Sequence, residues 1–176
     1  MIIYFLRHAN AGERVANPKK DEKRALDKAG IEQCGIVGRA LVALDVQIDV
    51  LISSPLKRAV QTASLVGNEL SYEGKLQMED ALRPEASFAA FRNLLEKYAR
   101  HESIMVVGHN PNLKEFLGRI ISEAGCEAEV ELKKGGVAKV ETGRNAAALM
   151  WYLTPKVLRE LYSAATESSR PKTSRK

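Results

Sequence analysis

Apolar residues along the chain fall into two kinds of pattern. Residues 1–6 (MIIYFL) form a continuous apolar run, which is typical of a strand buried on both faces. Shorter apolar runs predict two more strands at residues 49–54 (DVLISS) and 103–108 (SIMVVG). Apolar residues spaced by three and four predict amphipathic helices over residues 25–44 and 86–99. The pairs Ser54-Pro55 and Asn110-Pro111 indicate two more helix starts, leading to about Leu70 and to a stop at Gly125.

The remaining segments complete an alternation of strands and helices. A weaker strand is expected at residues 75–80, and closing strands at 130–142, bent at Gly135-Gly136, and at 147–153. Residues 10–24 are polar and predict a loop, while Thr154-Pro155 begins a short final helix. Strands that alternate with helices predict an α/β fold. We expect a three-layer sandwich, with a mostly parallel central sheet and helices on both faces.

Composition and charge bound the protein's class. The chain has 176 residues, of which 45% are hydrophobic and 28% charged, as in ordinary globular domains. We expect a single domain over residues 1–166. The net charge of +5 is concentrated in residues 167–176, which read as a basic, disordered tail and leave only about +2 elsewhere. That remainder is too small to indicate a nucleic-acid partner.

Cysteines and apolar run lengths indicate the compartment. Cys34 and Cys126 lack metal-ligand spacing and are expected to be reduced, buried thiols. Arg7 and His8 interrupt the first apolar run before a signal peptide could form, and no run reaches the ~18 residues of a membrane span. We therefore expect a cytoplasmic protein without membrane contact. The small size and the lack of an obvious exposed apolar stripe favour a monomer.

Chemically active residues follow the three clearest strands. Arg7-His8 follows the first, Arg58 lies in the helix after the second, and His109 follows the third. Ligands of open α/β sheets bind outside the carboxyl ends of strands. Two guanidinium groups together with helix N-termini at that edge predict a site for a phosphoryl group. His101 precedes its strand, so we expect it at the surface of the opposite edge.

Histidine chemistry suggests how that group would be handled. A neutral imidazole is a nucleophile near pH 7, and neighbouring guanidinium groups favour the neutral form. We expect His8 to attack phosphorus through one ring nitrogen while the other donates a hydrogen bond. Arg7, Arg58 and His109 would stabilise the transferred group, and water would then hydrolyse the phosphohistidine. The arginines already supply positive charge, so neither a metal nor a cofactor is expected.

The segments FLRHANA, SSPLKRAVQTA and VVGHNPNL resemble the signatures of the histidine phosphatase superfamily, which has the phosphoglycerate mutase-like fold. The chain is similar to its short SixA-type phosphohistidine phosphatases over nearly its whole length, including DEKRALDKAG, LKKGGVAKVE and WYLTPKVL. The resemblance implies that His8 is the phosphorylated nucleophile and that Arg7, Arg58 and His109 form the phosphate pocket. Ala9 stands where the superfamily commonly has glycine, a variant that fits the SixA-type branch.

Larger branches of that superfamily carry a carboxylate general acid on an inserted loop. Here the corresponding stretch is only MEDALRPEAS, in which Asp80 and Glu85 are both candidates and Glu85 is slightly favoured. Phosphohistidine leaves as an imidazole and needs a proton donor less than an alkoxide does. A short site therefore favours a phosphohistidine on another protein as substrate. A small-molecule phosphomonoesterase and a non-catalytic phosphate-binding module are the alternatives.

Overall fold

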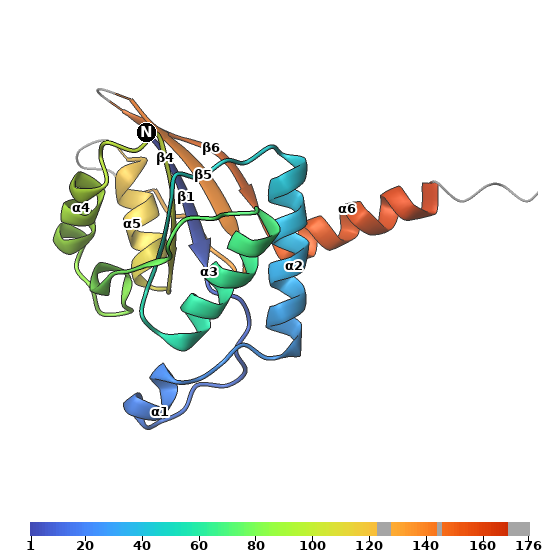
Figure 1. Ribbon diagram of the computed structural model, residues 1–176, viewed down its shortest axis with the longest axis horizontal. Coiled ribbons are helices and arrows are strands. Elements are labelled where there is room, and N and C mark those ends of the chain that lie inside the picture. Colours follow the sequence, from blue (N-terminus) through green and yellow to red (C-terminus); the bar gives the residue numbers. More distant parts are fainter. Residues whose placement is uncertain (123–127, 144–145, 169–176) are drawn as a thin grey trace, which may run out of the picture.

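The computed structural model describes residues 1–122, 128–143 and 146–168, and its strands form one sheet in the order β3–β2–β4–β1–β5–β6 (Figure 1). They are β1 (Ile2–Arg7), β2 (Val50–Ser53), β3 (Gln77–Met78), β4 (Ser103–Gly108), β5 (Val137–Thr142) and β6 (Ala147–Leu153). Strands β1 to β4 pair in parallel, and β5 and β6 add an antiparallel edge. The predicted mostly parallel sheet is confirmed.

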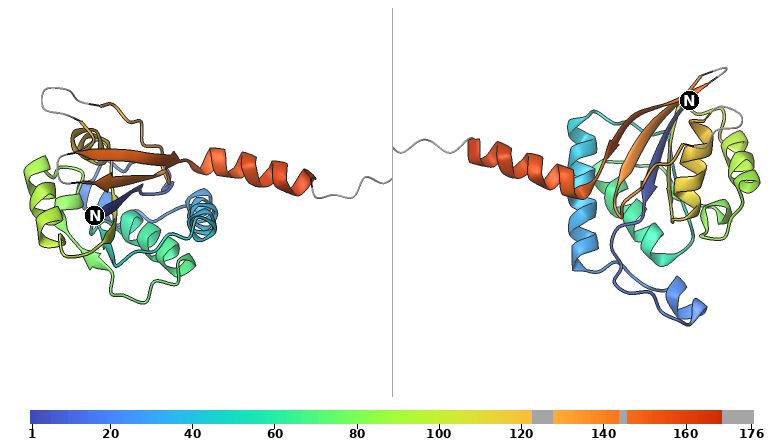
Figure 2. Two further views of the ribbon diagram at one scale, coloured as in Figure 1. Left: turned by 90° about the horizontal axis from the view of Figure 1, so that it is seen from above. Right: turned by 180° about the vertical axis from the view of Figure 1, so that it is seen from behind.

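Helices cover both faces of this sheet (Figure 2). They are α1 (Pro18–Glu22), α2 (Lys28–Ala43), α3 (Lys57–Glu69), the 3₁₀ turn η1 (Asp80–Leu82), α4 (Phe88–Lys97), α5 (Asn112–Ile120) and α6 (Pro155–Ser168). Alternate residues of β1 serve the two layers: Tyr4 and Leu6 pack toward α2 and α3, whereas Ile3 and Phe5 pack toward α4 and α5. The predicted three-layer α/β sandwich is confirmed.

Helix α6 packs against α2 through buried Leu158 and projects from the body of the molecule (Figures 1 and 2). It is longer than the short helix expected there and includes residues 167 and 168 of the predicted tail. The rest of that tail, residues 169–176, lies outside the described residues, as do Gly125 and Cys126. Cys34 is buried with a free thiol, as expected. None of the helices in the described ranges combines the length and the apolar character that a membrane span requires.

Several element boundaries differ from the prediction. Residues 10–24 include the short helix α1 as well as loop. Helix α3 begins at Lys57 without a side-chain cap, because the residue at its N-cap is Leu56 rather than Ser54. Helix α5 begins at Asn112 and ends at Ile120, short of the expected stop.

The segment before β5 covers the carboxyl end of β1. The strand expected over residues 130–142 begins only at Val137. Residues 130–136 do not belong to it, because Gly135, at φ +68°, turns the chain across the end of β1. The Gly135 N–H donates to the carbonyl oxygens of Arg7 and His8 at 3.1 and 3.2 Å. This turn therefore fixes the main chain of Arg7 and His8.

The start of α2 is fixed by its cap and by a close approach to the loop after β1. Asp27 accepts a hydrogen bond from the Gly30 N–H at 2.8 Å, so the helix begins at Lys28 rather than at residue 25. A Cβ added at Gly30 would lie 1.9 Å from the carbonyl oxygen of Asn10. Only glycine lets the helix approach the loop this closely.

We expect the Gly30→Ala substitution to lower the free energy of unfolding by about 2–3 kcal/mol, because the loop or the helix must move. Urea unfolding measures this change. Gly35→Ala in the same helix is the matched control, since its Cβ would meet only the flexible ends of the Arg39 and Glu69 side chains. That control should be neutral or stabilising by up to about 1 kcal/mol. Equal effects of both substitutions would contradict the close-approach explanation.

Candidate active site

Three neighbouring strands deliver their carboxyl ends to one place. Strand β4 lies between β1 and β2, with Arg7 opposite Gly108 and Ser53 opposite Val107. The pairing extends one residue further on each side, because the His8 N–H donates to Gly108 O at 3.0 Å and the Ser54 N–H to Val107 O at 2.9 Å. The residues that follow the three strands therefore start from adjacent main-chain positions.

A cleft of about 720 Å³ opens at this edge of the sheet. Its lining includes all the residues predicted for the site: Arg7, His8, Arg58, Glu85 and His109. Asp80, the other candidate acid, is exposed and is not among the lining residues. His101 is exposed beside the amino end of β4, as expected. The structure thus brings together the residues that sequence order had separated by up to 102 positions.

His8 is a buried, neutral imidazole with one free ring nitrogen. Its Nδ1 lies 2.7 Å from the Ala9 carbonyl oxygen, and because a carbonyl can only accept, Nδ1 carries the proton. Burial lowers the pKa of His8 to about 3, against the opposing effect of the Ala9 carbonyl and with the help of the Arg58 and Arg7 charges. The Nε2 lone pair is therefore available at neutral pH.

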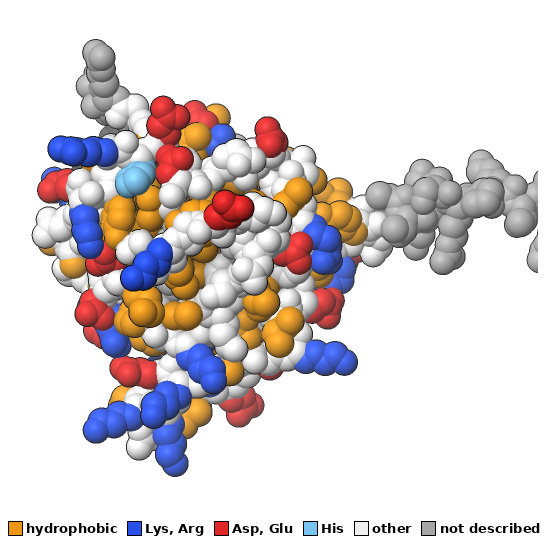
Figure 3. Space-filling model, viewed as in Figure 1, with side chains coloured by type: hydrophobic (Ala, Val, Ile, Leu, Met, Phe, Trp, Pro, Cys, Tyr) orange, Lys and Arg blue, Asp and Glu red, His pale blue; other side chains and the backbone are white. Residues whose placement is uncertain are grey.

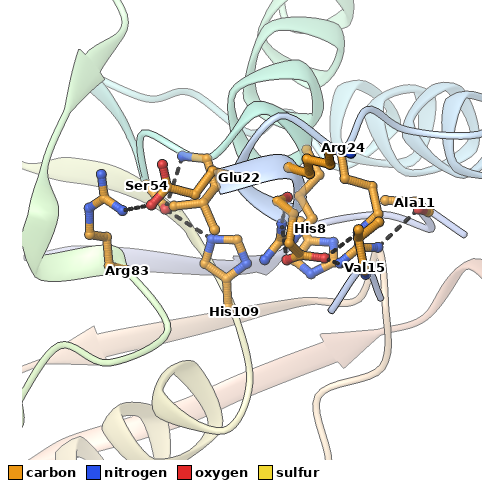
Figure 4. A network of polar contacts seen from close by, with 12 residues as sticks. His8, Ala11, Val15, Glu22, Arg24, Ser54, Arg83 and His109 are labelled. Atoms are coloured by element: carbon orange, nitrogen blue, oxygen red, sulfur yellow. Dashed lines mark hydrogen bonds and ion pairs between the residues drawn. The ribbon is translucent and has the colours of Figure 1, made fainter. Parts of the chain in front are cut away.

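His109 lies beside His8, with ring centroids 4.9 Å apart (Figure 4). Burial, together with the neighbouring His8 ring and the Arg58 charge, lowers the pKa of His109 to about 2. Its Nε2 is 2.9 Å from Oγ of fully buried Ser54, whose Oγ also accepts the Leu56 N–H at 3.4 Å. Among the described residues, His109 Nε2 is the one atom to which the Ser54 hydroxyl can donate, so we assign the hydroxyl as the donor of this hydrogen bond. The proton of neutral His109 then resides on Nδ1.

The arginines are each anchored through one nitrogen. Arg7 Nη1 donates to Leu132 O at 2.8 Å, and Arg58 Nη1 donates to the main-chain oxygen and to Oδ2 of Asp21 at 2.9 and 3.2 Å. Burial lowers the pKa of both guanidinium groups, although arginine stays charged at neutral pH. The Nε edge of each group remains unused by the protein.

Unpartnered buried polar atoms identify what the cleft is built to hold. In the part of the chain that the structure describes, the buried side-chain nitrogens and oxygens without a partner are Arg7 Nε, Arg58 Nε, His109 Nδ1 and Asn110 Oδ1. All four belong to residues that line the cleft. Buried polar groups are otherwise almost always paired, and three of these four are hydrogen-bond donors. Such an arrangement suits a tetrahedral oxyanion.

Acidic residues near the cleft are mostly held by arginines. Asp21 accepts from Arg24 Nε at 2.9 Å as well as from Arg58. Burial by itself would raise the pKa of Asp21, but the Arg24 hydrogen bond and the other donors lower it to about 2. Asp21 and Arg24 were not singled out in the sequence, where a run of six charged residues out of seven offers no signal for two of them.

Glu85 and Glu22 are two further carboxylates that line the cleft. Glu85 is exposed and makes no side-chain hydrogen bond or ion pair with the described residues. Glu22, which sequence reasoning missed, pairs with Arg83 Nη1 at 3.0 Å (Figure 4). Asp80 is bound to Nε of the same arginine at 2.6 Å and does not line the cleft.

Lys134 adds a cation that has no sequence signature. Its Nζ donates to Asn10 Oδ1 at 2.8 Å, and Asn10 in turn donates to Asp27, the cap of α2. Together with it the cleft is lined by the cations Arg7, Arg14, Arg24, Arg58 and Arg83 and by the anions Asp21, Glu22 and Glu85. The excess of positive charge favours an anionic ligand. Across the described residues, no group of three or more His, Cys, Asp or Glu side chains is arranged to hold a metal ion.

Because the pKa values of both site histidines are lowered, we expect stability to fall on acidification. The unfolded chain binds protons near pH 6.5, while folded His8 and His109 stay neutral down to about pH 3 and 2. Unfolding free energy should therefore decrease below pH 6.5, by up to about 1.4 kcal/mol per pH unit for each histidine. Urea unfolding at pH 7, 6 and 5 tests this. An unchanged slope in the double variant His8→Gln/His109→Gln would contradict it.

The Ser54 hydroxyl should control which nitrogen of His109 carries the proton. In Ser54→Ala we expect the ¹⁵N spectrum of His109 to show a mixture of tautomers, instead of the single form protonated at Nδ1. Ser53→Ala is the matched control, because Ser53 is equally buried but donates to the main-chain oxygen of Ser54 at 2.8 Å. The same spectrum in wild type and Ser54→Ala would disprove the assignment.

Comparison with known proteins places the chain in a family. Residues 3–101, more than half of the chain, match the histidine phosphatase superfamily (branch 1). An uncharacterized protein of Picosynechococcus sp. (strain ATCC 27264 / PCC 7002 / PR-6) is 32% identical over 146 residues, which are 81% of this chain and 86% of the relative.

Two solved structures share the fold. The structure of the protein histidine phosphatase SixA complexed with tungstate superimposes with a TM-score of 0.80 at 22% identity, covering 90% of this chain and 99% of that one. The α-ribazole phosphatase from Shigella flexneri superimposes with a TM-score of 0.67 at 16% identity, covering 88% and 97%. With the match to its sequence family, the chain belongs to branch 1 of the histidine phosphatase superfamily.

Proposed function

We propose that this phosphatase removes the phosphoryl group from phosphohistidine on another protein, by way of a phosphohistidine at His8. One observation carries the proposal. A neutral imidazole with its Nε2 free lies next to His109 in a cleft where three buried donors have no protein partner. Nucleophile and anion pocket are thus provided by the same few residues. The fold shared with a tungstate-bound histidine phosphatase supports an oxyanion as ligand.

In the first step, His8 Nε2 forms a bond to phosphorus as the bond from phosphorus to the substrate ring nitrogen breaks. The substrate ring carries a proton on its other nitrogen, so it leaves as neutral imidazole with the electron pair of the broken bond on the nitrogen that held phosphorus. The Nδ1 proton of His8, bound to Ala9 O, stabilises the positive charge that develops on the ring. Arg7 and Arg58 offer Nε donors, and His109 its Nδ1 donor, to the equatorial oxygens.

In the second step, a water molecule attacks phosphorus and the bond to His8 Nε2 breaks. Inorganic phosphate is released, the water proton goes to solvent or to a cleft carboxylate, and His8 returns to its neutral form. The low pKa of His8 favours this step. A weakly basic ring nitrogen is a good leaving group, and after phosphate departs Nε2 stays unprotonated and ready for the next cycle.

The wall of the cleft supports phosphohistidine over an alkyl phosphate. An alkoxide leaving group needs a positioned acid, whereas an imidazole does not. Glu85 is exposed and has no partner that would fix its position, and Arg83 holds Glu22. Only η1 and short loops connect β3 to α4, so no long insertion closes over the cleft.

A small phosphate ester is the second candidate substrate. The specific observation in its favour is that two carboxylates, Glu22 and Glu85, line the cleft. The α-ribazole phosphatase that shares this fold acts on a small molecule by its name. The two substrate classes differ in their need for the acid, which makes them separable by experiment.

Trapping of the intermediate tests the mechanism. After brief incubation with a labelled phosphohistidine peptide, we expect an acid-labile, alkali-stable label on His8. His8→Ala should lose the label and at least about 10³-fold of kcat, and Arg58→Ala about 10²-fold. His101→Ala, at the far edge of the sheet, is the control and should keep full activity. Full turnover in His8→Ala would exclude the mechanism, and tight phosphate binding without any wild-type turnover would indicate a binding module instead.

Substrate class is decided in the same assay. We expect kcat/KM for the phosphohistidine peptide to exceed that for sugar monophosphates, and Glu85→Gln to change it by less than about threefold. A preference for the sugar phosphates, together with a large loss in Glu85→Gln on them, would assign the small-ester activity.

A further inference from the structure

We propose that the exposed cations around α1 form a docking surface for an acidic face of the phosphorylated protein. This α1 basic surface consists of Arg14, Lys19, Lys20 and Lys23. The proposal rests on the proposed function and specifies its partner. Val15, Pro18 and Asp21 of the same segment line the cleft, so the surface lies at the entrance through which a phosphohistidine must pass. Figure 3 shows Lys and Arg side chains gathered at the bottom of the molecule, where Figure 1 places α1.

The segment's own acids do not neutralise this surface, because two of them are paired with arginines that line the cleft. Asp21 binds Arg58 and Arg24, and its side chain is only 14% exposed. Glu22 binds Arg83 on the opposite wall. The cleft arginines thereby take up the negative charge of α1. Its lysines remain on the outside with only Glu13 nearby in the chain.

The four cations have no ion-pair partner within the described ranges. Arg83, Arg119 and Lys139, among others, are paired with carboxylates, whereas none of the ion pairs includes a member of the α1 basic surface. All four side chains are exposed. Unpaired, exposed cations at an entrance attract an oppositely charged partner and raise its association rate more than its final affinity.

An acidic protein face is favoured over an anionic lipid surface as the occupant. The cations surround a cleft in which the reacting group must descend to buried His8, which a folded protein or a peptide can present. Binding to a lipid surface also relies on several large apolar side chains beside the cations. Between Arg14 and Lys23 the one large apolar side chain is Val15, and it lines the cleft.

Charge reversal at α1 tests this proposal. The variant Lys19→Glu/Lys20→Glu/Lys23→Glu should lower kcat/KM at low salt by at least about tenfold for a phosphohistidine peptide flanked by Asp and Glu. The wild-type rate should fall as salt rises, since screening shortens the reach of surface charges. The order of peptides for the wild type should be acidic, then neutral, then lysine-flanked. Inorganic phosphate should inhibit variant and wild type within about twofold of each other, because the inner pocket is intact.

The matched control is Arg39→Glu/Lys75→Glu/Arg100→Glu, which changes net charge equally at exposed positions away from the cleft. It should leave kcat/KM and its salt dependence nearly unchanged. Equal losses in both triple variants, or no preference for acidic peptides, would overturn the proposal. Loss of sedimentation with phosphatidylserine vesicles in the α1 variant, without peptide preference, would overturn it in favour of a lipid surface. Labelling of His8 in the wild type is established first. A failure of the proposed mechanism is then distinguished from a failure of the docking proposal.

Discussion

The site depends on the parallel pairing of β4 with both of its neighbours up to the last residues of the strands. The hydrogen bonds from His8 N–H to Gly108 O and from Ser54 N–H to Val107 O fix three chain segments side by side. Imidazole positions are therefore set by the main chain of the sheet centre, which is the most rigid part of such a fold. Loops of ordinary mobility could not hold two rings 4.9 Å apart with one nitrogen of each left free.

Keeping buried donors unpaired costs stability, and the surrounding structure has to offset that cost. The anchoring contacts do so in a common way. Arg7, Arg58 and the two histidines each use one polar atom on the protein and leave another for the ligand. One contact fixes the orientation of the group, and the free atom gives the cleft its affinity for an oxyanion. Positive charges that lower the histidine pKa values also keep the rings neutral for chemistry.

What could be predicted from the sequence was what local pattern encodes. The runs of β1, β2 and β4 identify the buried strands, and Arg7, His8, Arg58 and His109 are near their ends. The function of Ser54 could not be predicted, because Ser-Pro is a local helix-start signal and the tertiary contact with His109 prevailed. The positions of Asp21, Glu22 and Lys134 in the cleft could not be predicted either. They depend on contacts between segments far apart in the sequence, and Asp21 and Glu22 also lie in a run of charged residues that gives neither of them a distinguishing pattern. The exposed, unpartnered position of Glu85 likewise required coordinates.

The carbonyl oxygen of Leu132 accepts from both Arg7 Nη1 and Asn110 Nδ2, at 2.8 and 3.0 Å. A main-chain oxygen is present whatever side chain the residue carries. Evolution can therefore vary this position within the limits of apolar packing while two polar groups of the cleft keep their orientation. Sequence comparison alone would register residue 132 as an unremarkable core position, and an insertion or deletion beside it would disturb the cleft more than any exchange among similar apolar side chains.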